Sequence, residues 1–119
     1  MGIIIEYEGV KGIDKYIIIL KSICLLYGIS NDEIYEILKN KKCRYLLLLL
    51  MKNFQCFDKN IIMEQLKLKS DRTIISNMKK AEEKLLINKE FREDYFYLEE
   101  KIKKNFKKDK KTLEKGLLM

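Results

Sequence analysis

The sequence contains no histidine, no proline and no tryptophan, and it has only five glycines among 119 residues. Without histidine, and with three cysteines that show no Cys-x-x-Cys spacing, we expect no zinc site and no other cofactor. The odd number of cysteines (Cys24, Cys43 and Cys56) predicts reduced thiols in a cytoplasmic protein, with Cys24 in the core. Few helix-breaking residues, together with many Leu, Ile, Lys and Glu, predict an all-α chain.

Long hydrophobic runs are absent too. The longest uncharged apolar run, from Tyr45 to Met51, is far shorter than the ~20 residues that a membrane span needs. Residues 1–13 carry two glutamates and no basic leader, which argues against a cleavable signal peptide. We therefore expect no membrane partner.

Charge is abundant and unevenly distributed. The formal net charge is +7, and residues 61–119 carry sixteen Lys and Arg against eleven Asp and Glu, whereas residues 1–60 carry nine against seven. A positive excess in one half favours a polyanion such as nucleic acid as the partner. A Lys-rich composition that only keeps the protein dissolved is the alternative interpretation.

Hydrophobic periodicity predicts about six helices in a domain of residues 13–104, between an N-terminal arm or short strand (1–12) and a Lys-rich tail (105–119). The first helix is expected to start near Asp14, to end at Gly28 and to be largely buried, Ile17 and Leu25 included. A second helix follows the capping-box sequence Ser30 to Glu33. The third covers Tyr45 to Phe54, and its five consecutive leucines mark it as the central helix.

The most informative segment is residues 59–86. Asp58 is expected to cap a short fourth helix, Lys67 to Lys69 form a tight turn, and Ser70 is expected to cap a longer fifth helix. In the fifth helix the inward stripe is predicted to comprise Ile74, Ile75, Met78, Ala81 and Leu85. This is the layout of a helix-turn-helix, whose second helix enters the DNA major groove. A last helix from about residue 88 carries Phe91, Tyr95, Leu98 and Ile102 in register and is expected to continue into the Lys-rich tail.

The order of these segments resembles the C-terminal DNA-binding domain, Trp-repressor-like in fold, of the DnaA replication initiator family, over residues 17–104. The segment Tyr27-Gly-Ile-Ser-Asn-Asp-Glu-Ile34 is similar to the family's Tyr-Phe-Gly-Val-x-x-Glu-Asp-Leu. The basic stretch Lys41 to Arg44 and the following leucines resemble its basic loop and the next helix. Residues 69–83 lie over the signature Arg-Asp-His-Thr-Thr-Val-x-x-Ala-x-Arg-Lys-Ile-Glu-Glu.

The departures from that signature concern the residues that read DNA in the family. Ser70, Asp71 and Arg72 stand where the family has aspartate, histidine and threonine, and only Thr73 is kept. The initiator's ATPase motif, Gly-x-x-x-x-Gly-Lys-Ser/Thr, is also missing. The resemblance therefore implies the fold and a DNA-binding surface, but neither the family's target site nor an initiator.

On this interpretation the chain is a non-enzymatic duplex DNA-binding protein, either a small transcriptional regulator or an accessory factor of replication or of a mobile element. The residues expected to contact bases are Arg72, Ser76 and Asn77. The residues expected to contact phosphates are Lys69, Ser70, Thr73, Lys79 and Lys80, joined by Lys41, Lys42 and Arg44 from the basic junction. A solvated surface helix with no ligand is the competing interpretation of the same pattern.

A second function class stays open at this stage. A DnaA-like fold that has lost DNA reading would serve as a protein-interaction module or homodimer, with Phe96 and Tyr97 as an exposed aromatic contact. Catalysis has little support, because acidic residues such as Glu82 and Glu83 sit on helix surfaces and no histidine is present. We expect no enzyme activity and no small-molecule substrate.

Overall fold

The computed structural model describes residues 12–30, 39–68 and 70–118. This part of the chain holds five helices and no strand, which confirms the all-α fold class. The helices are α2 (Gly12–Tyr27), α4 (Lys41–Asn53), α5 (Lys59–Leu66), α6 (Asp71–Ile87) and α7 (Lys89–Leu118). Residues 1–11 of the predicted N-terminal arm and residues 31–38 of the predicted second helix lie outside the described residues. Gly12, which was predicted to belong to the arm, begins α2.

The central helix is α4, as the leucine run predicted. Every residue from Tyr45 to Met51 is buried, because α2, α6 and α7 all pack against this helix. The prediction that it begins at Tyr45 was wrong: it begins at Lys41, where the Asn40 side chain accepts a hydrogen bond of 3.1 Å from the Cys43 backbone N–H. That bond satisfies one of the first-turn donors that a helix leaves unpaired, so the helix starts there.

Helix α2 packs on α4 and α7 and ends as predicted. Gly28 takes a positive φ of 65°, and Ile29 N–H donates to the Cys24 carbonyl at 2.9 Å. The expectation that α2 is largely buried was wrong on its outer side, where Ile17 is 41% and Leu25 is 82% exposed. Burial depends on which helices lie alongside, and α4 and α7 cover only one side of α2.

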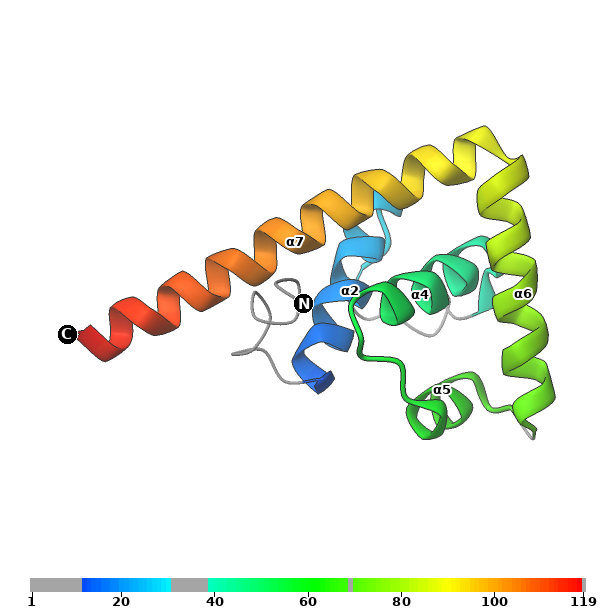
Figure 1. Cartoon of the computed structure of the whole chain (residues 1–119), viewed down its shortest axis with the longest axis horizontal. Coiled ribbons are helices and arrows are strands. Elements are labelled where there is room, and N and C mark those ends of the chain that lie inside the picture. Colours follow the sequence, from blue (N-terminus) through cyan, green and yellow to red (C-terminus); the bar gives the residue numbers. More distant parts are fainter. Residues whose placement is uncertain (1–11, 31–38, 69, 119) are drawn as a thin grey trace.

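The longest helix, α7, packs against α2, α4 and α6 and completes the core. Its predicted stripe is confirmed: Phe91, Tyr95, Leu98 and Ile102 are all buried. One turn further on, Phe106 is also buried, with its ring 5.2 Å from that of Phe54 in an edge-to-face contact. The helix continues through the Lys-rich segment to Leu118, and Figure 1 shows that end reaching away from α6.

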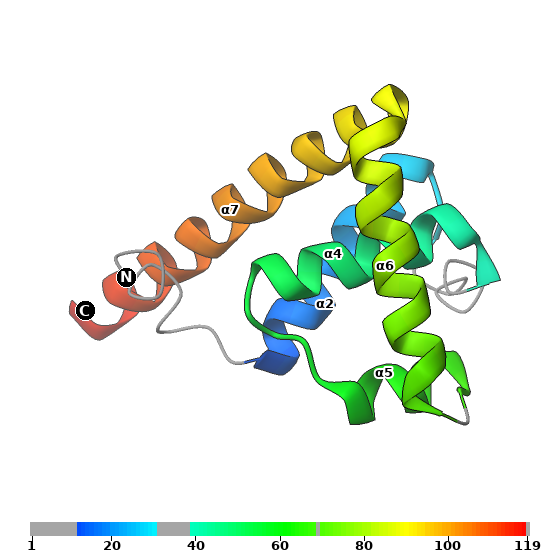
Figure 2. The ribbon, with the colours of Figure 1, turned by 45° about the vertical axis from the view of Figure 1, so that its right-hand side comes forward.

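The arrangement leaves α5 and α6 at one edge of the molecule. Figure 2 shows α6 crossing in front of α4, with α5 beside the N-terminal end of α6. None of the described helices combines the length and the apolar character needed to cross a membrane.

Candidate nucleic-acid interface

The sequence predicted a helix-turn-helix at residues 59–86, and the structure has two helices joined by a tight turn there. Asp58 caps α5, its carboxylate accepting from Asn60 and Ile61 N–H at 2.9 and 3.3 Å. Lys67 adopts the left-handed conformation (φ 52°, ψ 43°), and Leu68 N–H donates to the Met63 carbonyl at 2.9 Å. This pattern ends α5 abruptly and turns the chain toward α6.

Helix α6 packs one face on the core. Ile74 and Ala81 are buried, and Met78 and Leu85 are half-buried, as the stripe predicted. The assignment of Ile75 to that stripe was wrong, since its side chain is 60% exposed. Successive residues in an α-helix differ by ~100° in direction, so Ile75 points sideways when Ile74 points into the core.

The predicted base-reading residues divide into two groups. Arg72 and Ser76 are both exposed to solvent and lie one turn apart on the outer face of α6. Asn77 is half-buried, and its amide nitrogen donates to the Thr73 carbonyl of its own helix at 2.7 Å. The structure therefore presents Arg72 and Ser76 outward and holds Asn77 against α6.

The first turn of α6 carries two of the predicted phosphate-binding residues. Ser70 sits at the N-cap in an extended conformation, but its side chain makes no capping hydrogen bond. Thr73 is exposed, and so are Lys79 and Lys80 further along the helix. Lys69 lies outside the described residues.

Lys41 and Lys80 come together although they are far apart in the sequence. Both line a hollow of about 450 Å³ between the start of α4 and the C-terminal half of α6. Lys84, which sequence reasoning missed, lines it too, with its ammonium group 5.9 Å from the centre of the Tyr45 ring and 5.2 Å from that of Phe91. Three cations, Lys41, Lys80 and Lys84, and one acid, Glu83, therefore line this hollow.

Lys42, also predicted to bind phosphate, faces the protein. Its ammonium group lies 2.8 Å from the Asp94 carboxylate and 3.7 Å from that of Glu90. Tyr27 donates its hydroxyl hydrogen to the same Asp94 oxygen at 2.7 Å. Arg44, from the same basic stretch, is half-buried. Lys41 is therefore exposed on the surface, whereas Lys42 and Arg44 are half-buried.

The cluster of Tyr27, Lys42 and Asp94 joins α2, α4 and α7. Burial raises the pKa of Tyr27, and the hydrogen bond to Asp94 raises it further. Burial alone would raise the pKa of Asp94, but the hydrogen bonds from Lys42 and Tyr27 outweigh it and lower the pKa below 3.8. At neutral pH Lys42 and Asp94 are charged and Tyr27 is neutral, and together they fix the position of α4's first turn.

Replacing Asp94 with asparagine is expected to lower the free energy of unfolding by about 1–2 kcal/mol at pH 7, because Lys42 loses its charged partner. Since the folded-state pKa is below the unfolded value, the contribution is complete above the unfolded pKa and is lost as pH falls below it. The difference in stability between the wild-type and Asp94→Asn proteins should therefore begin to shrink as the pH falls below about 4, and it should vanish only below the folded-state pKa of Asp94. Urea titrations from pH 3 to pH 7 measure this.

Glu93→Gln is the matched control, because Glu93 is an exposed neighbour whose pair with Lys89 is 3.9 Å long. Exposed pairs of this kind contribute less than about 0.5 kcal/mol. An equal loss of stability in Glu93→Gln and Asp94→Asn would contradict a specific role for the cluster.

Phe96 and Tyr97 do not form one aromatic patch. They are 51% and 45% exposed, as predicted, but adjacent residues point in directions ~100° apart on the helix. The Phe96 ring stacks edge-to-face on Tyr95 at 5.5 Å. Tyr97 instead lines a hollow beside Leu25 and Leu26 of α2. Phe96 and Tyr97 therefore lie on different sides of α7, and a partner that contacts Phe96 need not contact Tyr97.

The described residues contain no group of histidine, cysteine and acidic side chains able to hold a metal ion. All three cysteines are free thiols in the core, as expected for Cys24. Burial raises the pKa of each thiol, that of Cys56 to about 11. Thiols held protonated in this way are poor nucleophiles.

Comparison with family models, with curated proteins and with solved structures finds no match to this chain. The resemblance to the DnaA domain therefore stays a prediction from the sequence.

Proposed function

We propose that this protein binds duplex DNA without catalysis, through the helix-turn-helix formed by α5 and α6. In this proposal Arg72 and Ser76 read base edges, and Lys41, Lys79 and Lys80 hold phosphates. Its role is that of a small transcriptional regulator or of an accessory factor in replication or a mobile element, as the DnaA-like sequence suggests. A cytoplasmic site of action is part of the proposal, because the three cysteines form no disulfide with one another.

The proposal rests on the orientation that the turn between α5 and α6 gives to α6. Left-handed Lys67 and extended Ser70 bring the chain from α5 into α6, and Ile74 and Ala81 then anchor α6 on the core. The opposite face, with Arg72 and Ser76, is left exposed near the N-terminal end of the helix. A recognition helix makes base contacts with residues at this end.

Charge supports the same assignment. Asp71 would oppose a phosphate at the start of α6, but its carboxylate lies 3.6 Å from the Lys59 ammonium group, which partly neutralises it. Glu82 is similarly paired with Lys52 at 2.8 Å. Of the acidic residues on α6, only Glu83 has no ion pair among the described residues that would offset its charge.

The test is selection from a randomised duplex pool, sequenced after binding at low and physiological salt. The wild-type protein should enrich a motif, and Arg72→Ala should relax it at the positions that Arg72 reads, with a loss of about 1–3 kcal/mol for the preferred site. Lys21→Ala, which removes an exposed cation from α2, is the control and should leave the motif unchanged. Absence of any enriched motif would exclude sequence-specific binding.

Exposed apolar side chains favour a second candidate, a protein-interaction module or homodimer. Leu86 and Ile87, at the end of α6, are 76% and 84% exposed, in addition to Phe96 and Tyr97. Large exposed apolar groups are typical of contact surfaces. Binding through them should change little with salt, whereas binding to phosphates weakens steeply, so a salt titration separates the two candidates.

A further inference from the structure

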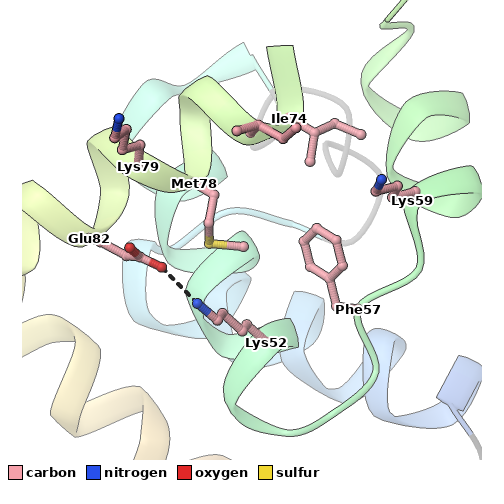
Figure 3. Close-up of a pocket in the computed structure, with 8 residues that line it drawn as sticks. Lys52, Phe57, Lys59, Ile74, Met78, Lys79 and Glu82 are labelled. Atoms are coloured by element: carbon pink, nitrogen blue, oxygen red, sulfur yellow. Dashed lines mark hydrogen bonds and ion pairs between the residues drawn. The ribbon is translucent and has the colours of Figure 1, made fainter. Parts of the chain in front are cut away.

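A hollow of about 440 Å³ lies on the flank of α6, away from the cationic hollow shared by Lys41 and Lys80. It is bounded by the end of α4, the segment that follows, the start of α5 and one side of α6. Eight residues line it: Phe57, Ile74, Ile75 and Met78 form an apolar floor, and Lys52, Lys59, Lys79 and Glu82 form a charged rim (Figure 3). We call it the α6 flank groove.

The floor of the α6 flank groove is apolar surface that the described helices leave open. Figure 3 shows the Phe57 ring and the Met78 thioether projecting into it from facing walls. Ile75, which the sequence wrongly placed in the core, also lines the groove and is 60% exposed. Concave apolar surface of this volume is within the range of small-molecule sites, about 300–1,000 Å³.

The rim carries an excess of positive charge. Lys52 is neutralised by Glu82 at 2.8 Å, and Lys59 lies 3.6 Å from Asp71. Lys79 is exposed, and no ion pair of its ammonium group is found within the described part of the chain. A ligand with an apolar body and a negatively charged group would match both the apolar floor and the positively charged rim of the groove.

We propose that the α6 flank groove binds a small apolar anion, an aliphatic or aromatic carboxylate. The apolar body would lie on Phe57 and Met78, whose flexible thioether adapts to ligands of different shape. The carboxylate would pair with Lys79 in a charge-assisted hydrogen bond. The concave shape of the groove and its volume of about 440 Å³ favour this occupant, because small-molecule sites are concave, mostly apolar and of this size.

A ligand in the α6 flank groove would also weaken DNA binding, an effect that rests on the proposed function. Lys79 is one of the cations assigned to DNA phosphates, so a bound carboxylate would compete with DNA for it. By linkage, DNA would weaken the ligand by the same factor as the ligand weakens DNA. The test of the site itself uses no DNA, so failure of the site and failure of DNA binding are distinguishable.

The probe is 1-anilinonaphthalene-8-sulfonate, an aromatic anion whose fluorescence rises in apolar surroundings, titrated into the full chain. One probe should bind per chain and saturate, while near-UV circular dichroism shows intact tertiary packing. Decanoate, below its micelle concentration, should displace the probe, and decylammonium should not. Binding without saturation, or equal displacement by both competitors, would overturn the proposal.

Two matched pairs of variants locate the probe. Ile75→Glu should raise the Kd at least about tenfold. Leu25→Glu alters an 82% exposed apolar residue of another hollow, which Leu25, Tyr97 and Lys101 line between α2 and α7 (the α2–α7 hollow), and it should change the Kd less than about twofold. Lys79→Met should raise the Kd about threefold or more, and Lys101→Met, in the α2–α7 hollow, should not. Loss of binding in Leu25→Glu with retention in Ile75→Glu would place the ligand in the other hollow and refute the site.

Discussion

Leu48→Ala is expected to lower the free energy of unfolding by about 3 kcal/mol. Leu48 is fully buried in the middle of α4, the helix on which α2, α6 and α7 all pack. Truncation removes buried methyl groups and leaves a cavity that neighbours on several sides cannot fill without moving. For a domain of this size such a loss is a large share of the total stability. Urea unfolding followed by far-UV circular dichroism measures it.

Leu25→Ala is the matched control, since it makes the same chemical change at an 82% exposed position. Its effect should stay within about 0.5 kcal/mol of zero. If the two variants were equally destabilised, the described packing of α2 and α4 would be incorrect. If neither were destabilised, α4 would not be the centre of the core.

Duplex DNA affinity is expected to fall about 40-fold between 50 and 200 mM salt. In the proposal Lys41, Lys79 and Lys80 each neutralise a phosphate, and each neutralised phosphate adds about −0.9 to the slope of log K against log salt. Removing Lys41 and Lys80 together should make the slope shallower by about 2, because they line one hollow and would hold neighbouring phosphates. Fluorescence anisotropy with a labelled duplex at several salt concentrations provides the slope.

Lys21→Ala on α2 should leave that slope unchanged, since Lys21 lies on no surface assigned to DNA. A slope near zero in the wild-type protein would exclude phosphate contacts and favour the protein-interaction candidate. A normal slope that the Lys41→Ala/Lys80→Ala variant does not change would place the phosphates elsewhere on the molecule.

Several features of the fold were predictable from short stretches of sequence. The cap at Asp58, the stop at Gly28 and the stripe of Phe91, Tyr95 and Leu98 all depend on residues within one or two turns of each other. The start of α4 was missed because Lys41 to Arg44 were assigned to a basic junction before the helix, and the capping residue Asn40 was overlooked. Local signals therefore located the helices to within a turn.

Burial at helix flanks was less predictable. Ile17, Leu25 and Ile75 are apolar and lie beside buried positions, so hydrophobicity alone assigns them to the core. Whether a neighbouring helix covers a flank depends on how whole helices cross, and no short window of sequence contains that information.

The sequence by itself determined the helical class, the positions of α5, the turn and α6, and the excess of positive charge in the C-terminal half, because propensity, capping and composition are local properties. The tertiary structure decided which cations face solvent. Lys41 and Lys42 are neighbours in sequence, yet Lys42 is bound to Asp94 and Lys41 lines a hollow with Lys80. It also decided that Ile75 borders an open groove and not the core. These outcomes arise from contacts between distant segments, which only the packing of α4, α6 and α7 brings together.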